Sequence, residues 1–409
     1  MTKVVVIGYV WPEPNSSAAG SHMLSILRLF VQQGWQVEFA TPAQATEHMI
    51  DLQEEGVSSR GIRLNCDSFD AYIADYQPDI VLFDRFMMEE QFGWRVEKYC
   101  PQALKILDTE DLQCLRHARH ESLKAGREMR QADLYSDLAK REIAAILRCD
   151  LSLIISSYEM TLLSDTFNIN ASLLHHLPFM VDMDLLPQHT PTYAQRQHFM
   201  AIGNFRHAPN WDMVLTLQQL WPSIRKQLPE SELHIYGAYP PPKATALHNP
   251  KAGFLIKGWA EDALAVMAGY RICLAPIRFG AGIKGKLLDA MLMQTPSVTT
   301  YMGSEGMHHD EPWPGAIVDK PAEIVHAAVQ LYKNESIWHT AQQYAPDLLR
   351  RYYDAKKLGP DLIKRIVALQ QGLKQHRLNN FTGAMLKHHT MMSSKYMSQW
   401  IAAKNSALS

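Results

Sequence analysis

The sequence is poor in cysteine and contains no long hydrophobic run. Its five cysteines are scattered and form no C-x-x-C pair, so neither a disulfide framework nor a zinc site is expected. No apolar segment reaches the roughly 20 residues that a helix needs to span a bilayer. The opening apolar run is not followed by a small-residue cleavage site. These absences predict a cytoplasmic protein with reduced thiols and no signal peptide.

Charge of neither sign is in excess, because 40 Lys and Arg stand against 42 Asp and Glu in 409 residues. This balance gives no support to a nucleic-acid-binding protein. The 18 histidines form no H-E-x-x-H or H-x-x-x-H cluster, so no metal ligands are predicted. The first strand is not followed by G-x-G-x-x-G, which disfavours a dehydrogenase.

Apolar strands alternate with helical segments in two series, which predicts an α/β fold with parallel sheets. The first series has strands at 4–8, 37–40, 80–83, 104–107 and 151–155, and the second at 199–203, 233–237, 272–275 and 297–300. A polar, proline-containing stretch at 178–197 separates them. We therefore expect two Rossmann-like, doubly wound domains, residues 1–185 and 195–350, that face a cleft in which ligand binds.

Two segments carry unusual compositions. Residues 109–147 are rich in Arg and Glu, which predicts a long helical stretch with a solvated charged face. The predicted helical tail, residues 351–409, mixes His, Met, Lys and aromatic residues, as in 381–397. Its helices either pack back on the first domain or include an amphipathic helix on a membrane surface, in which case the protein is peripheral to the inner membrane.

The stretch 275–291 is the richest in chemistry. A strand ends in a loop with Gly280, Gly282 and Gly285, and a helix follows that carries Lys286 and Asp289. Glycines allow a ligand to approach the backbone, and a helix N-terminus offers free N–H groups to an anion. Together with Lys284, this pattern predicts a diphosphate site. The alternative is a glycine-rich loop with solvated lysines.

This stretch, with residues 294–306 after it, resembles the donor-binding segment of GT-B glycosyltransferases of family four. The resemblance implies two Rossmann-like domains and a nucleotide-diphosphate-sugar donor, and it places Asp289 where the family has its ribose-binding carboxylate. Ala281 stands where the family usually has a second carboxylate, and Gln294 replaces a common glycine. Loop residues implied to contact the donor are Gly280, Gly282, Ile283, Lys284 and Lys286.

Further stretches of the second half share the resemblance. Arg206 follows the first strand of the second domain, where a family arginine contacts the diphosphate, but Trp211 replaces the lysine that usually comes next. The resemblance places Tyr236, Gly237, Gly258 and Trp259 around the nucleobase. For Tyr236 and Trp259, packing in the core is the alternative.

In the first half, the loop that ends at Gly20 resembles the family loop that faces the distal phosphate and the acceptor. Asp84, Asp108 and Asp111 follow two strands at the carboxyl edge of the predicted sheet, where open sheets place their chemistry. They are candidates for positioning or deprotonating the acceptor. The segment Ser156-Ser-Tyr-Glu159 resembles a family Ser-x-x-Glu, and its alternative is a capping box at a helix N-terminus.

The sequence thus predicts a glycosyltransferase that moves a sugar from a nucleotide-diphosphate sugar to a hydroxyl of a glycan, lipid-linked or protein acceptor. The resemblance implies retention of configuration, no metal and no cofactor beyond the donor, and glycan or polysaccharide biosynthesis as the setting. A nucleotide-sugar epimerase of the same fold and a non-catalytic partner subunit are the alternatives. The catalytic candidates are Asp84, Asp108, Asp111, Arg206 and Lys286.

Overall fold

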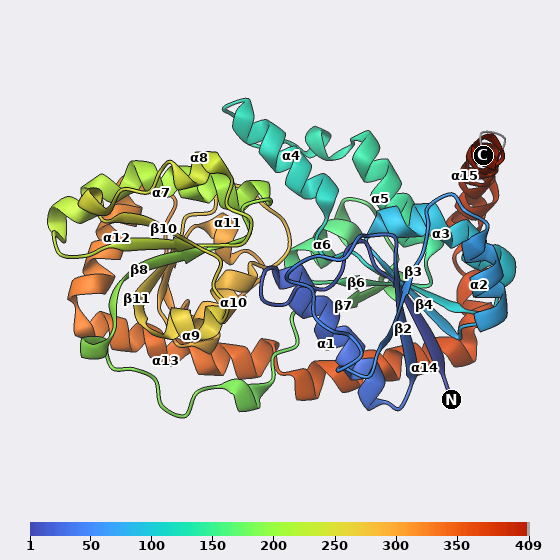
Figure 1. The fold of residues 1–409 in the computed structure, drawn as a ribbon, viewed down its shortest axis with the longest axis horizontal. Helices are drawn as coiled ribbons and strands as arrows, with labels where there is room; N and C mark the ends of the chain where they lie inside the picture. The colour runs from blue at the N-terminus through green and yellow to red at the C-terminus, as the bar shows by residue number, and fades with distance from the viewer. Residues whose placement is uncertain (407–409) are drawn as a thin grey trace.

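Two parallel β-sheets lie side by side in the computed structural model, which describes residues 1–406 (Figure 1). The first sheet has seven strands in the order β3-β2-β1-β4-β5-β6-β7. Its strands are β1 (Lys3–Ile7), β2 (Gln36–Thr41), β3 (Ser58–Gly61), β4 (Ile80–Asp84), β5 (Leu104–Asp108), β6 (Leu151–Ile154) and β7 (Leu174–His176). All the pairings are parallel, as expected for strands joined by crossover helices.

The second sheet has six strands in the order β10-β9-β8-β11-β12-β13, which repeats the arrangement of the first six strands of the first sheet. Its strands are β8 (Gln197–Ile202), β9 (Leu233–Tyr236), β10 (Phe254–Gly258), β11 (Tyr270–Ala275), β12 (Ser297–Thr299) and β13 (Gly315–Ile317). Both orders reverse direction beside their first strand, which is the doubly wound pattern. The predicted α/β class with two Rossmann-like sheets is confirmed.

Helices cover both faces of each sheet (Figure 1). In the first domain these are α1 (Ala18–Gln32), α2 (Ser68–Tyr76), α3 (Phe86–Tyr99), α4 (Gln113–Lys124), α5 (Asp137–Arg148) and α6 (Ser157–Asp165). In the second they are α7 (Ala208–Gln227), α8 (Pro242–Thr245), α9 (Ala263–Ala268), α10 (Gly285–Leu292), α11 (Tyr301–Ser304), α12 (Pro321–Lys333) and α13 (Glu335–Tyr352). The central strands are buried on both faces, which explains why they are mostly apolar in the sequence.

The sequence predicts one long helical stretch with a solvated face at 109–147. The structure instead has two helices there, α4 and α5. The chain turns between them at Gly126, whose φ of 65° suits glycine, and at the short 3-10 helix Gln131–Leu134. Its charged residues are also not all solvated, because Arg119 and Glu142 are buried. The charge run therefore includes side chains that hold neighbouring elements together.

After α13 the chain returns to the first domain through α14 (Ala355–Leu378) and α15 (Phe381–Ser406). Leu362, Ile366 and Leu369 of α14 pack into the core beneath β1, β4 and β5. α15 lies against α3 and α5. Residues 407–409 of the predicted tail lie outside the described residues. Within residues 1–406, no helix is long and apolar enough to cross a membrane.

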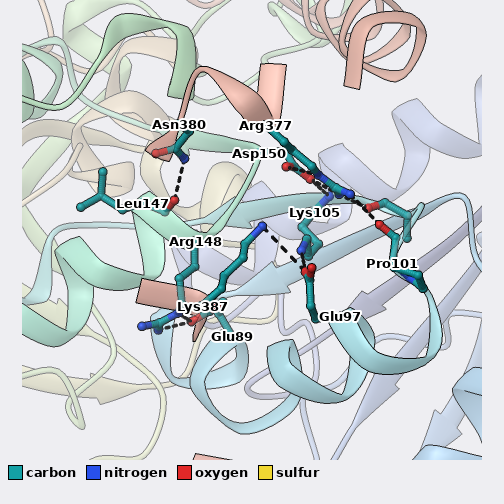
Figure 2. Close-up of polar contacts among 11 residues, drawn as sticks. Glu89, Glu97, Pro101, Lys105, Leu147, Arg148, Asp150, Arg377, Asn380 and Lys387 are labelled. Carbon is teal, nitrogen blue, oxygen red and sulfur yellow. Dashed lines mark hydrogen bonds and ion pairs between the residues drawn. The ribbon is translucent and has the colours of Figure 1, made fainter. Parts of the chain in front are cut away.

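Polar contacts fix the two tail helices to the first domain (Figure 2). Arg377 donates to the Asp150 carboxylate at 2.7 and 2.8 Å and to the carbonyl oxygens of Pro101 and Ala103. Asn380 donates to the Leu147 carbonyl oxygen at 2.8 Å. These bonds satisfy backbone carbonyls at the ends of α3 and α5, so the tail completes the surface of the first domain.

Candidate functional site

Two buried carboxylates end neighbouring strands of the first sheet. Asp84 Oδ2 accepts the Tyr9 N–H at 2.9 Å, and Asp108 Oδ1 accepts the Glu110 N–H at 3.3 Å. Asp84 Oδ1 and Asp108 Oδ2 are buried without a hydrogen-bond partner. Burial raises the pKa of Asp84, and the charge of Asp108 adds to the rise while Arg85 opposes it. Unpaired buried carboxylate oxygens are costly, so a site that holds two of them is a candidate for ligand binding.

His22 joins these carboxylates, and sequence reasoning missed it. It lies on the buried face of α1, two residues after Gly20, and its Nε2 is 3.7 Å from Asp108 Oδ1. Neither ring nitrogen has a hydrogen-bond partner, and the ring packs edge-on against Phe179. The available signal was a histidine on the apolar side of the first helix, next to the loop that was already singled out. Metal-ligand spacing, which none of the histidines shows, does not reveal such a residue.

Glu159 does not form the predicted capping box, because the Ser156 side chain makes no cap hydrogen bond. Instead its Oε1 accepts the N–H of Leu112 at 3.0 Å and the N–H of Gly282 at 2.8 Å, while Oε2 has no partner. Burial and the nearby Asp111 carboxylate raise the pKa of Glu159 to about 8. The side chain therefore ties the loop after β5 to the glycine-rich loop of the second domain.

The glycine-rich loop packs directly on the first domain. Gly282 has a φ of 61°, and a Cβ there would lie 2.9 Å from Asp111 Cβ, so only glycine fits. The Gly280 carbonyl oxygen accepts from Arg119 Nη1 at 2.8 Å. Arg119 also forms a two-bond ion pair with Glu305 at 2.7 and 2.8 Å. The loop is thus held in shape by both domains.

The two lysines of the loop and helix are not solvated, which rules out the solvated-lysine interpretation. Lys284 is buried, and its Nζ donates to the Gly282 carbonyl oxygen at 2.8 Å. Lys286 donates from Nζ to Asn210 Oδ1 at 2.5 Å. Burial lowers the pKa of each lysine to about 8. Ile283, just before Lys284, is buried in the core of the second domain.

Asp289 lies one turn after Lys286 on α10. Its surroundings raise the pKa of its carboxyl to about 7 through burial, against the opposing charge of Lys286. No hydrogen bond or ion pair involves its side chain within the described part of the chain. At the start of the same helix, a Cβ on Gly285 would lie 2.5 Å from Ala18 Cβ, so α10 and α1 begin close together.

Arg206 lies in the loop before α7 and is exposed. Its guanidinium stacks at 3.6 Å on the ring of Tyr239, whose hydroxyl donates to Glu13 of the first domain at 3.0 Å. Burial, together with the charge of Arg116, lowers the pKa of the next residue, His207, to about 4. Asp111 pairs with Arg116, which holds the pKa of that carboxyl below its usual range despite burial. Charged groups of both domains therefore meet here.

The residues assigned to the nucleobase fall into two groups. The Tyr236 hydroxyl bonds the Tyr270 hydroxyl at 2.8 Å, and its ring packs on the core, as the packing alternative predicts. Trp259 is not in the core, because it is 40% exposed, stacks on His48 and donates from Nε1 to the Asn15 carbonyl oxygen. A Cβ on Gly237 would strike the Gly203 carbonyl. Gly258 has a φ of 78°, and a Cβ there would meet no neighbour.

The structure thus brings most predicted site residues to the surface where the two domains meet. Side chains of both domains already touch across the predicted cleft, through Trp259, Tyr239, Arg119 and the glycine-rich loop. Gly20 lies within the first turns of α1, where a Cβ would lie 2.5 Å from the Glu13 backbone. No group of three or more His, Cys, Asp or Glu in residues 1–406 is arranged to hold a metal ion.

Comparisons with known proteins agree with this arrangement. Residues 196–334 match the family model described as "Glycosyl transferases group 1". A search of curated proteins by sequence finds no match. Sucrose-phosphate synthase from Thermosynechococcus elongatus has a similar structure, with a TM-score of 0.69 and 14% identity over 90% of this chain and 99% of that one.

Two further structures that are similar to this chain contain bound ligands. A mutant of S. aureus TarM in complex with fondaparinux, α-GlcNAc-glycerol and UDP has a TM-score of 0.70 and 9% identity over 90% of this chain and 100% of that one. Anabaena HepE in complex with UDP and glucose has a TM-score of 0.68 and 11% identity over 90% and 100%. These comparisons confirm the predicted resemblance and the GT-B fold.

Proposed function

We propose that this chain, a GT-B protein whose second domain matches the group 1 glycosyltransferase family, transfers a sugar from a nucleoside-diphosphate sugar to an acceptor hydroxyl. The observation that carries this proposal is that each domain contributes one part of a possible site to the interface between them. The second domain brings a glycine-rich loop, the start of α10 and Lys286. The first brings Asp84 and Asp108, each with one buried carboxylate oxygen that accepts no hydrogen bond, and His22 beside Asp108.

The second domain's half suits the leaving diphosphate. As the bond between the sugar carbon and the diphosphate oxygen breaks, negative charge grows on the phosphate oxygens. Lys286, Arg206 and the free N–H groups at the start of α10 would stabilise this charge. Lys286 is held by a neutral partner, Asn210, and not by a carboxylate, so its charge is available. Asp289 would accept the ribose hydroxyls, for which an unpaired carboxylate is suited.

The first domain's half suits the acceptor. A sugar or lipid-linked hydroxyl that enters beside Asp108 could donate to the unpaired Oδ2, and His22 could fix its orientation. The new bond forms between the acceptor oxygen and the sugar carbon as the old one breaks, and the acceptor proton leaves to a phosphate oxygen or a carboxylate. Asp111 is occupied by Arg116, so we assign it to positioning the interface.

The finer parts of this proposal rest on the family resemblance and the neighbouring structures. Retention of configuration and independence from metal follow from the resemblance. UDP is the first nucleotide to test, since two of the similar structures hold it. Among the other similar structures are a lipopolysaccharide outer core galactosyltransferase and a glycosyltransferase of lipopolysaccharide biosynthesis, which support a glycan or polysaccharide pathway. The five free thiols suit the reducing cytoplasm.

The test is product formation from a panel of nucleoside-diphosphate sugars, with and without an extract of glycan and lipid acceptors. Release of nucleoside diphosphate and a new glycoside only with extract supports transfer. A sugar that is isomerised or freed without acceptor indicates the epimerase alternative. Lys286→Ala should reduce kcat, whereas Lys226→Ala, on the surface of α7, should not.

A non-catalytic partner subunit would give neither result. Departures from the family pattern suggested it, and two of them, at Trp211 and Ala281, have a structural context. The Lys243 ammonium lies 4.5 Å from the centre of the Trp211 ring, so a lysine from α8 lies next to the residue that replaces the usual lysine. Ala281 is buried in the core of the first domain, where a carboxylate would be unfavourable. The product assay therefore decides between the transferase and a non-catalytic subunit.

A further inference from the structure

The last helix, α15, presents an apolar face that no described part of the protein covers. Between residues 378 and 400, seven large apolar side chains are exposed. They include Phe381, which is 77% exposed, and Trp400, which is 61% exposed. The seven are Leu378, Phe381, Met385, Met392, Tyr396, Met397 and Trp400. Clustered exposure of this kind marks an interaction site more often than single exposed residues do.

Four of the seven exposed residues form one stripe on the helix. Phe381, Met385, Met392 and Tyr396 are spaced by four, seven and four residues, which places them on the same side of an α-helix. We call this stripe, together with Trp400, the outer face of α15. Apolar residues occur around the whole of α15. This pattern is normal for a helix that packs on its own protein on one side and on a partner on the other.

The opposite side of α15 is already occupied. Gly383 lies so close to the Leu147 carbonyl that a Cβ would strike it. Lys387 lies 3.7 Å from the Glu97 carboxylate (Figure 2). The Ser398 hydroxyl accepts from Arg95 and donates to Asn65, both at 3.0 Å. The helix is therefore fixed with its outer face turned away from α3 and α5.

The charge of the last 48 residues indicates which kind of partner this face binds. Residues 362–409 contain seven Lys and Arg and no Asp or Glu, whereas residues 1–361 contain 33 Lys and Arg and 42 Asp and Glu. Lys395 and Lys404, on the turns that carry Tyr396 and Trp400, lie over those rings at 5.6 and 5.3 Å. Neither has a carboxylate partner within residues 1–406. A second copy of this face would bring like charges together, which disfavours self-association.

We propose that the outer face of α15 binds the surface of a membrane that contains anionic lipids. Aromatic and Met side chains enter the boundary between headgroups and acyl chains, and Lys395 and Lys404 face the anionic headgroups. The helix lies in the plane of the surface, with the first domain above it. This surface is outside the domain interface, so its test does not depend on sugar transfer.

The test is sedimentation of the full chain with two kinds of vesicle, phosphatidylcholine alone and phosphatidylcholine with about 30% phosphatidylglycerol. The protein should sediment with the anionic vesicles and not with the neutral ones, and the binding should weaken as salt is raised. The pair Phe381→Ser and Trp400→Ser should lower the partition coefficient at least about tenfold. The pair Ile337→Ser and Tyr344→Ser, exposed on α13, is the matched control and should bind as the unaltered protein does.

A charge exchange tests the second part of the proposal. Lys395→Glu with Lys404→Glu should lower binding to the anionic vesicles about 30-fold. Lys226→Glu with Lys251→Glu, which makes the same change on the second domain, should have little effect. The proposal is overturned if the full chain fails to sediment with anionic vesicles, or if the outer-face variants bind as well as their controls. A dimer that the Phe381 and Trp400 substitutions dissociate, without vesicle binding, would assign this face to a second copy instead.

Discussion

Replacement of Glu159 is the sharpest probe of how the two domains share one site. Its Oε1 accepts two buried N–H groups, one from Leu112 in the first domain and one from Gly282 in the glycine-rich loop. Glu159→Ala would leave both donors unpaired, at about 1–3 kcal/mol each. Glu159→Gln keeps an acceptor oxygen of the same reach, so it should preserve both bonds. We therefore expect Ala to lower the thermal midpoint by roughly 2–7 °C and Gln to lower it little.

The pH dependence gives the same residue a second, independent readout. Burial and Asp111 raise the pKa of Glu159 to about 8 from an ordinary value of 4.5. The folded state therefore binds the proton more tightly than the unfolded state does, and this contribution to stability is complete below about pH 4.5 and is lost as pH rises toward 8. Because Gln cannot ionise, the Gln variant should gain on the unaltered protein across that interval, by up to roughly 5 kcal/mol.

Thermal unfolding of the unaltered protein and the two variants at several pH values between 5 and about 9 measures both effects. The Gln variant should be as stable as the unaltered protein near pH 5 and more stable above pH 8. The reasoning is refuted if Gln is as destabilising as Ala at pH 5. It is also refuted if the difference between Gln and the unaltered protein does not change with pH.

Three further predictions concern the same interface. Arg119→Ala removes the ion pair with Glu305 and the bond to the Gly280 carbonyl, so small-angle scattering should show a larger radius of gyration; an unchanged radius would show that other contacts hold the domains together. His22→Phe should raise the KM for acceptor or lower kcat by about tenfold or more and leave nucleotide affinity unchanged; a loss of nucleotide binding would place His22 on the donor side. The kcat/KM of the free enzyme should fall as pH rises through about 8, where Lys286 loses its proton, and Lys286→Arg should move that fall to higher pH. The same fall in Lys286→Arg would assign the titration to another group.

The architecture was readable from the sequence because its central strands are buried on both faces. Continuous apolar runs make up residues 4–7 of β1, 80–83 of β4 and 272–275 of β11, as is typical of a buried parallel sheet. The strands that were missed, among them β3 and β13, are short or polar. β3 (Ser58–Gly61) is an exposed edge strand whose place is set by pairing with β2, not by its own composition. Such strands carry no local signal.

The donor side of the site was found through its residues, and the links between domains were not. Gly280, Lys286 and Asp289 lie in one segment, where glycine and charge mark a loop and a helix start. The role of Glu159 depends on a partner 123 residues away, so the local pattern favoured a capping box. Arg119 was read as part of a solvated charge run, because nothing near it in the sequence reveals Glu305, 186 residues further on.

The burial of His22 likewise could not be derived from its neighbours. It depends on how α1 packs on the first sheet, which places the ring next to Asp108 at the end of β5. Trp259 shows the same limit in the opposite direction: an aromatic residue after a strand was as consistent with the core as with the surface. Its position against His48 follows from how the two domains meet. Contacts between domains are thus the part of the site that sequence patterns convey least.

The most direct measurement of the central claim is thermal unfolding of the protein against UDP, GDP, ADP, TDP and CDP. A nucleotide at about 100 times its Kd adds roughly 2.7 kcal/mol, which raises the midpoint by several degrees. The account predicts a rise with one nucleotide, UDP first, that Asp289→Ala abolishes and Asp347→Ala, a carboxylate exposed on α13, retains. No rise with any of the five nucleotides, or a rise that persists in Asp289→Ala, would contradict the assignment of the donor site.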